Sequence, residues 1–115
     1  MRFCYGTTRT VLLIGSWAVK FPALSAWHLF LLGLLGNMQE RQFSKLGWPE
    51  LCPVTWSIPG GWLVVMRRAL PLTRDEFQDL DFDEFRIKDE YTVPVENKLD
   101  SFGWIDGRLV AVDYG

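Results

Sequence analysis

Residues 10–22, TVLLIGSWAVKFP, contain two short runs of apolar and β-branched residues separated by Gly15 and Ser16. β-Branched and aromatic residues favour strands, and a glycine in the first position of a two-residue loop favours a tight turn. The stretch therefore predicts a β-hairpin with strands at residues 10–14 and 17–21, and Pro22 closes the second strand. What surrounds this hairpin decides the class of fold.

A long helix is predicted directly after the hairpin, with Ser25 as N-cap and Ala26 as its first residue. The side of this helix opposite its main apolar stripe carries Gly33 and Gly36, with Glu40 one turn further on. A helix that is apolar on two sides is expected between two layers or between subunits, and the glycines predict close approach of another backbone. One apolar stripe recurs at helical spacing: Trp27, Phe30, Leu31, Leu34, Leu35 and Met38.

Two more hairpins and a short helix follow. Thr73 and Glu76 form a capping box for a short acidic helix, and residues 83–91 are predicted to be irregular. The order hairpin, helix, hairpin, short helix, hairpin predicts one α+β domain over residues 1–115, with antiparallel hairpins packed on one main helix. The two hairpins are expected at residues 53–58 and 62–67 around Pro59-Gly60-Gly61, and at residues 102–105 and 108–112 around Asp106-Gly107.

The composition narrows the classes of function. With 49 % hydrophobic residues the 115-residue chain is expected to fold, and a net charge of −2 disfavours nucleic-acid binding, even through Arg67, Arg68 and Arg74. Two cysteines and one histidine predict reduced thiols and no metal site built on such residues. The apolar run at residues 24–36 is shorter than the roughly 20 residues that span a bilayer. We therefore expect a soluble, cytoplasmic protein.

Three segments, in order, resemble parts of a protein kinase. Residues 17–20, WAVK, are similar to the strand whose lysine binds nucleotide phosphates, which implies that role for Lys20. Glu40, twenty positions on, matches the helix glutamate that pairs with this lysine. Residues 53–67 resemble the next two kinase strands. The tail is KLDSFG at residues 98–103 and DGRLVAVDYG at residues 106–115. It resembles the end of the kinase catalytic loop followed by a DYG form of the metal-binding Asp-Phe-Gly. This resemblance implies metal binding by Asp113.

The chain departs from the kinase pattern at residues that catalysis needs. Residues 4–10 contain only Gly6 where a glycine-rich loop should cover the phosphates. Alignment on the tail places Glu96 at the catalytic aspartate and Ser101 at the asparagine that binds the second Mg²⁺. The sequence ends at Gly115, before an activation segment or a helical lobe. The resemblance thus implies a degenerate, pseudokinase-like fold, and the arrangement is also similar to small phage-encoded proteins of bacterial hosts.

Two hypotheses of function remain. The first is a non-catalytic protein-interaction module, without cofactor, that binds a partner protein or itself. It is expected to act through the apolar helix or the aromatic hairpin, with Trp56, Trp62, Gly33 and Gly36 as interface residues. The alternative is a Mg-ATP-binding phosphotransferase that uses Lys20, Glu40 and Asp113, with Ser101 as a second metal ligand and Glu96 as base. Trp27 and Trp104 are expected in the core under either hypothesis.

Overall fold

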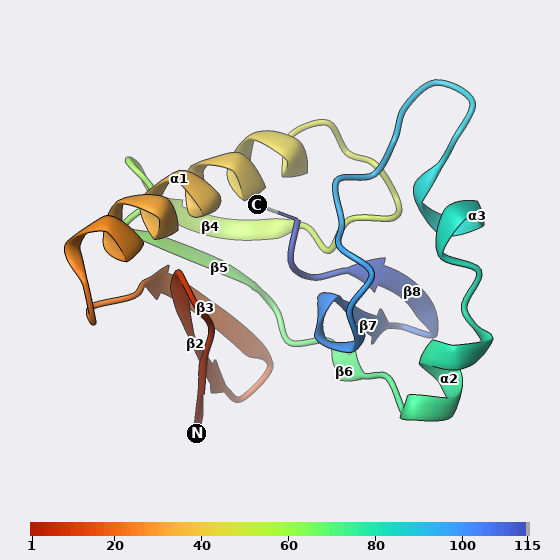
Figure 1. Ribbon diagram of the computed structural model, residues 1–115, viewed down its shortest axis with the longest axis horizontal. Helices are drawn as coiled ribbons and strands as arrows, with labels where there is room; N and C mark the ends of the chain where they lie inside the picture. The colour runs from red at the N-terminus through yellow and green to blue at the C-terminus, as the bar shows by residue number, and fades with distance from the viewer. Residues whose placement is uncertain (115) are drawn as a thin grey trace.

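The computed structural model describes residues 1–114 and has an α+β fold with two antiparallel sheets and one long helix (Figure 1). This confirms the predicted fold class; Gly115, the last residue of the DYG segment, lies outside the described residues. The elements follow in the order β1 (Arg2–Tyr5), β2 (Arg9–Ile14), β3 (Trp17–Pro22), α1 (Trp27–Ser44), β4 (Val54–Ile58), β5 (Leu63–Arg67), β6 (Leu70–Pro71), α2 (Arg74–Asp79), α3 (Phe82–Arg86), the 3₁₀ turn η1 (Leu99–Ser101), β7 (Phe102–Ile105) and β8 (Arg108–Ala111).

The larger sheet has five strands in the order β1-β2-β3-β5-β4, and β3 is its central strand. Helix α1 lies along one face of this sheet (Figure 1). Successive side chains of a strand point to opposite faces, so Ala18 and Lys20 are buried on the α1 side while Trp17 is exposed on the other. The sheet therefore has one covered face and one open face.

The smaller sheet, in the order β6-β7-β8, lies beside the larger one and is joined to it through a common core (Figure 1). A single parallel bridge between Leu51 and Ala111 departs from the otherwise antiparallel pairing that the turns predict. The turn between β7 and β8 has Asp106 at φ 52° and Gly107 at φ 77°, the left-handed conformations that this Asp-Gly pair predicts.

One hydrophobic cluster contains buried residues of both sheets. Val64 and Met66 of β5 belong to it, as do Val110 of β8 and Phe102 of β7. The aromatic rings of α2 and α3 surround Phe102, with ring centroids 5.3–6.2 Å away. The short acidic helix with its predicted Thr73 capping box is present and is anchored by these rings.

The orientation of α1 differs from what its apolar stripe predicts. The residues that it buries are Gly33, Gly36, Asn37 and Glu40, whereas Trp27, expected in the core, is 73 % exposed. The reason is steric. A Cβ atom on Gly33 would lie 2.3 Å from the backbone oxygen of Thr8, in the loop before β2. Only a side of the helix that carries glycine therefore fits this close to the sheet. Four residues of the stripe that the sequence marks as core are exposed on the outer side of α1, namely Trp27, Leu31, Leu35 and Met38, whereas Phe30 and Leu34 are half-buried.

Several element boundaries also differ. Ala26, not Ser25, is the N-cap of α1, and no side chain caps it. The helix runs to Ser44, further than its apolar stripe indicates. Residues 83–86 were expected to be irregular but belong to α3. This helix forms because Asp81 caps it and its phenylalanines contact the core. Trp104, expected in the core, is only partly buried against it. Strands β1 and β6 were not predicted, since both are short and lack alternating apolar residues.

Replacing Gly33 tests the close packing of α1 on the sheet. Alanine is a better helix former than glycine by about 1 kcal/mol, but its Cβ would also lie 2.8 Å from Cα of Pro22. Backbone atoms cannot move aside as a side chain can. We expect Gly33→Ala to lower the free energy of unfolding by roughly 1–3 kcal/mol in urea titrations. Gln39→Ala, on an exposed position of the same helix, is the control; equal stability of both variants would contradict the packing.

Candidate functional site

The side chain of Glu40 is completely buried between α1 and the larger sheet. Lys20, on the central strand β3, donates from its Nζ to Oε1 of Glu40 at 2.9 Å and to Oε2 at 3.0 Å. The predicted ion pair between these residues is therefore present. It forms because β3 and α1 are consecutive elements whose facing sides carry Lys20 and Glu40.

A second cation, Arg9, completes the coordination of this carboxylate. Its Nη1 lies 2.9 Å from Oε1 of Glu40, and its Nη2 donates to Oε2 at 3.0 Å. The same Nη2 contacts Oδ1 of Asp113. Arg9 was missed by the sequence analysis, although its position two residues before Val11 places it on the inward face of β2. That alternation is the signal in the sequence by which Arg9 was identifiable as inward-facing.

The segment after β8 closes the cluster from the C-terminal side and returns toward α1 (Figure 1). The backbone N–H of Tyr114 donates to Oε2 of Glu40 at 2.9 Å, and Lys20 donates to the carbonyl of Val112. The hydroxyl of Tyr114 donates to the carbonyl of Cys52 at 2.6 Å, and burial raises the pKa of this phenol above its ordinary value. The ion cluster, which we define as Arg9, Lys20, Glu40 and Asp113, thus joins three parts of the chain.

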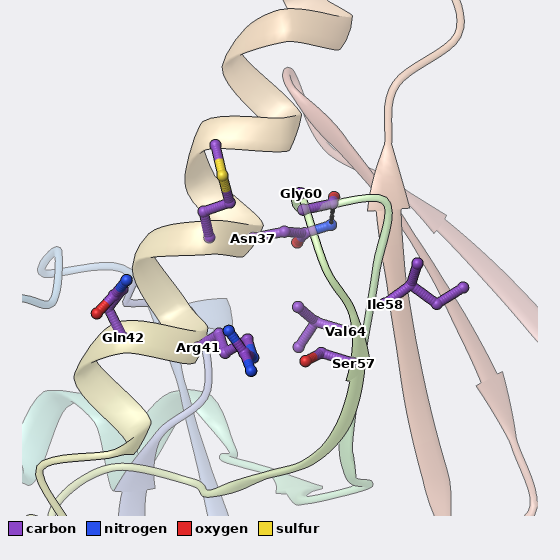
Figure 2. Close-up of a pocket in the computed structure, with 9 residues that line it drawn as sticks. Asn37, Arg41, Gln42, Ser57, Ile58, Gly60 and Val64 are labelled. Carbon is purple, nitrogen blue, oxygen red and sulfur yellow. Dashed lines mark hydrogen bonds between the residues drawn. The ribbon is translucent and has the colours of Figure 1, made fainter.

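Asn37 supports the ion cluster from α1 and is also completely buried. Its Oδ1 accepts from Arg9 at 3.2 Å, and its Nδ2 donates to the carbonyls of Lys20 and Gly61 at 3.3 and 2.9 Å. Figure 2 shows Asn37 pointing from α1 toward the turn at Gly60. One side chain thereby fixes Arg9, the end of β3 and the β4–β5 turn relative to one another.

The charges and hydrogen bonds of the ion cluster are satisfied internally. It contains two cations and two carboxylates, and the three donors of the Lys20 ammonium all have acceptors within the chain. Burial alone would raise the pKa of Glu40, but the attraction of Lys20 and Arg9 outweighs it, so this pKa lies below its ordinary value of 4.5. The carboxylate is therefore ionised at neutral pH.

The other residues of the predicted nucleotide site lie in different surroundings. Asp113 is in the cluster, with 54 % of its side chain exposed. Ser101 is buried, and its carbonyl accepts from the N–H of Val112. Glu96 is exposed and forms an ion pair with Lys98 at 2.8 Å. The structure thus brings Lys20, Glu40 and Asp113 together, while Glu96 and Ser101 stand outside the cluster.

The residues predicted at an interface divide into two groups. Trp56 on β4 is 59 % exposed, and Trp62 is 54 % exposed with its ring 5.4 Å from that of Phe30 on α1. Gly33 and Gly36 are buried against the sheet of their own chain. The close backbone approach that the glycines indicate is therefore an intramolecular one in this structure.

The two best-defined hollows within residues 1–114 are not lined by any residue of the ion cluster. A cavity of about 100 Å³ lies between α1 and the β4–β5 hairpin, lined by residues that include Asn37, Arg41 and Val64 (Figure 2). A more open one of about 630 Å³ lies between the α2–α3 segment and β7–β8. Pockets for small molecules usually enclose roughly 300–1,000 Å³, so the first hollow is too small, whereas the second, open one lies within this range but away from the ion cluster.

Comparisons of the chain with protein-family models, with curated proteins and with solved structures found no match. Within residues 1–114, no three or more histidine, cysteine, aspartate or glutamate side chains are grouped so that they could hold a metal ion. In the same part of the chain, no helix has both the length and the apolar character needed to cross a bilayer. The function is therefore inferred from the geometry of the ion cluster and from the exposed residues of the surface.

Glu40→Gln tests the ion cluster and its pH dependence. Removing one partner of a buried ion pair leaves the other charges uncompensated, so we expect unfolding free energy at pH 7 to fall by roughly 3–5 kcal/mol. The lowered pKa of Glu40 contributes stability above its ordinary value of 4.5, and this contribution is lost as the pH falls through the folded-state pKa. The difference between wild type and variant should therefore shrink in acid.

Glu96→Gln is the matched control for this prediction, because Glu96 is an exposed glutamate in a surface ion pair. Surface pairs of this kind contribute little, so its stability should follow the wild type at each pH. Thermal melts of the three proteins between pH 7 and pH 3 give the comparison. A Glu40→Gln variant as stable as the wild type at neutral pH would show that the buried ions do not hold the fold together.

Proposed function

We propose that the chain is a non-catalytic protein-interaction module with a kinase-like fold, in which the ion cluster is a structural lock. One observation carries the proposal: Arg9 occupies the space between Glu40 and Asp113 and pairs with both. In the family that the sequence resembles, this lysine, glutamate and aspartate serve Mg-ATP. Here Arg9 neutralises the carboxylates that a metal ion would need.

Binding of a phosphate group would have to break contacts that the folded protein already makes. Lys20 would give up an acceptor among Glu40 and the carbonyl of Val112, and Asp113 would give up Arg9. A buried charge that loses its partner is strongly destabilising, so these exchanges oppose ligand binding. Two further observations oppose nucleotide chemistry at this site. Glu96, expected as base, is exposed and paired with Lys98, and Ser101, expected as metal ligand, is buried.

The surface supports the interaction part of the proposal. The outer side of α1 exposes Trp27, Leu31, Leu35 and Met38, which follow one another along three turns of the helix. Trp62 extends this helix surface onto the β4–β5 hairpin through its contact with Phe30. Contiguous exposed apolar patches of this kind mark interaction sites on folded proteins more often than single exposed apolar residues do.

The compartment forms part of the same proposal. Both Cys4 and Cys52 are free thiols, and free thiols persist in reducing compartments. We therefore propose a cytoplasmic location, where the module would act by binding another protein. Nucleic acid is disfavoured as a partner by the net charge of −2.

The alternative, a Mg-ATP-binding phosphotransferase-like protein, has one observation in its favour. Lys20, Glu40 and Asp113 lie together, as the resemblance to kinases implies, and the side chain of Asp113 is half exposed to solvent. In this alternative a metal ion replaces Arg9 at Asp113. The two proposals therefore differ in whether Arg9 yields its place to a ligand.

Thermal stability in the presence of Mg-ATP separates the two. A ligand that binds only the native state raises its stability, by about 2.7 kcal/mol at one hundred times the dissociation constant. We expect millimolar Mg-ATP to leave both the melting temperature and the tryptophan emission of the wild type unchanged relative to Mg²⁺ alone. A Mg²⁺-dependent rise that Lys20→Ala and Asp113→Ala each abolish would instead establish the nucleotide-binding alternative, provided both variants remain folded by circular dichroism.

A further inference from the structure

The open face of the larger sheet is apolar across its full width. The strand register aligns one cross-strand row over all five strands, with side chains that share this face: Phe3, Leu12, Val19, Val65 and Trp56. Lys20 and Ala18 point to the opposite face, toward α1, because side chains alternate along β3. The row is therefore on the side of the sheet that α1 leaves uncovered.

The residues at the margins of this face are large and strongly exposed. We define the sheet surface by its six most exposed apolar members: Phe3, Tyr5, Ile14, Trp17, Trp56 and Ile58. Tyr5 is 80 % exposed and Trp56 59 % exposed. The row between them has the smaller side chains Val19 and Val65. Large exposed side chains thus surround a centre of smaller valine and leucine side chains.

The sheet surface has almost no charge. In the register of β3 with β5, Arg67 shares its face, opposite Trp17 at one end. Arg67 is held by Asp106, with Nη1 2.9 Å from Oδ2. An anionic membrane or a nucleic acid would require unpaired basic side chains on this face. A charged protein partner would require side chains of opposite charge. An apolar face whose arginine is already paired within the chain instead complements a copy of itself.

We propose that the sheet surface is the interface of a homodimer in which two copies pack their larger sheets face to face about a two-fold axis. Fully buried aromatic side chains remove roughly 150–250 Å² each from solvent, so the exposed parts of the six residues and the row between them approach the ~800 Å² per partner of a standard interface. Packed sheets lie about 10 Å apart, with interdigitated side chains, which suits aromatic margins over a valine centre.

This inference rests on the proposed function in that it names the partner for one surface of the interaction module. It uses a different face from the helix surface on α1, and it involves neither Arg9 nor the rest of the ion cluster. A two-fold interface buries the same patch on both copies, which closes the assembly at two. The helix surface stays free for a different protein.

Sedimentation equilibrium and light scattering of the full chain test the dimer. We expect a mass twice that of the 13.3 kDa chain at tens of micromolar protein. Trp56→Lys, on the edge strand β4, and Val19→Lys, in the central strand, should each weaken self-association at least about tenfold, because a lysine would be buried opposite an apolar face. Circular dichroism shows whether each variant is folded, and Trp56→Lys keeps the test available if Val19→Lys is not.

Leu31→Lys is the matched control, since Leu31 is 47 % exposed on the helix surface. It should leave the dimer intact. The proposal is overturned if the wild type is monomeric at about 100 μM, well above the dissociation constants of standard-size interfaces. It is also overturned if Leu31→Lys dissociates a dimer that Trp56→Lys leaves intact, or if the monomer binds phosphatidylcholine vesicles through Trp56. A monomer unaffected by Mg-ATP would refute the dimer and leave the proposed function standing, whereas a dimer that binds Mg-ATP would do the reverse.

Discussion

A carboxylate that is shut off from water has to be surrounded by positive charge and hydrogen-bond donors, and Glu40 sets this requirement for the whole molecule. Transferring an ionised group from water into a protein interior is unfavourable by several kcal/mol unless partners replace its hydration. Glu40 obtains its partners from β2, from β3 and from the segment after β8, through Arg9, Lys20 and Tyr114. The need to satisfy one anion therefore brings both sheets and α1 to a single point.

The same requirement explains why α1 is turned with its most apolar side outward. The helix approaches the sheet closely enough for glycine at position 33, and it must also deliver Asn37 and Glu40 to buried partners. Both demands fall on one side of the helix, so the bulky residues that begin with Trp27 are left on the other. With the outer face of the sheet also apolar, the protein has two hydrophobic surfaces on opposite sides of the layer that contains the ion cluster.

The sequence was sufficient for the parts of the fold that local chemistry determines. Turns at Gly15 and at Asp106-Gly107 depend on residues that adopt left-handed backbone angles, and the capping box depends on two residues three positions apart, Thr73 and Glu76. The pairing of Lys20 with Glu40 also followed from a motif. Periodicity was misleading for α1, because it reports how apolar a face is and not how near the neighbouring backbone lies. Arg9 was missed because its partners are 31 and 104 residues away in the chain.

Those long separations have a consequence for how the protein is made. Contacts between residues distant in sequence form late, because the loop between them must first be ordered. During synthesis at about 5–20 residues per second, Arg9, Lys20 and Glu40 leave the ribosome several seconds before Asp113 and Tyr114. Until then Glu40 lacks one of its donors, and the open face of the sheet is already available to other nascent chains. The segment after β8 completes the ion cluster only at the end of this interval, and before then a chaperone would have the most apolar surface to protect.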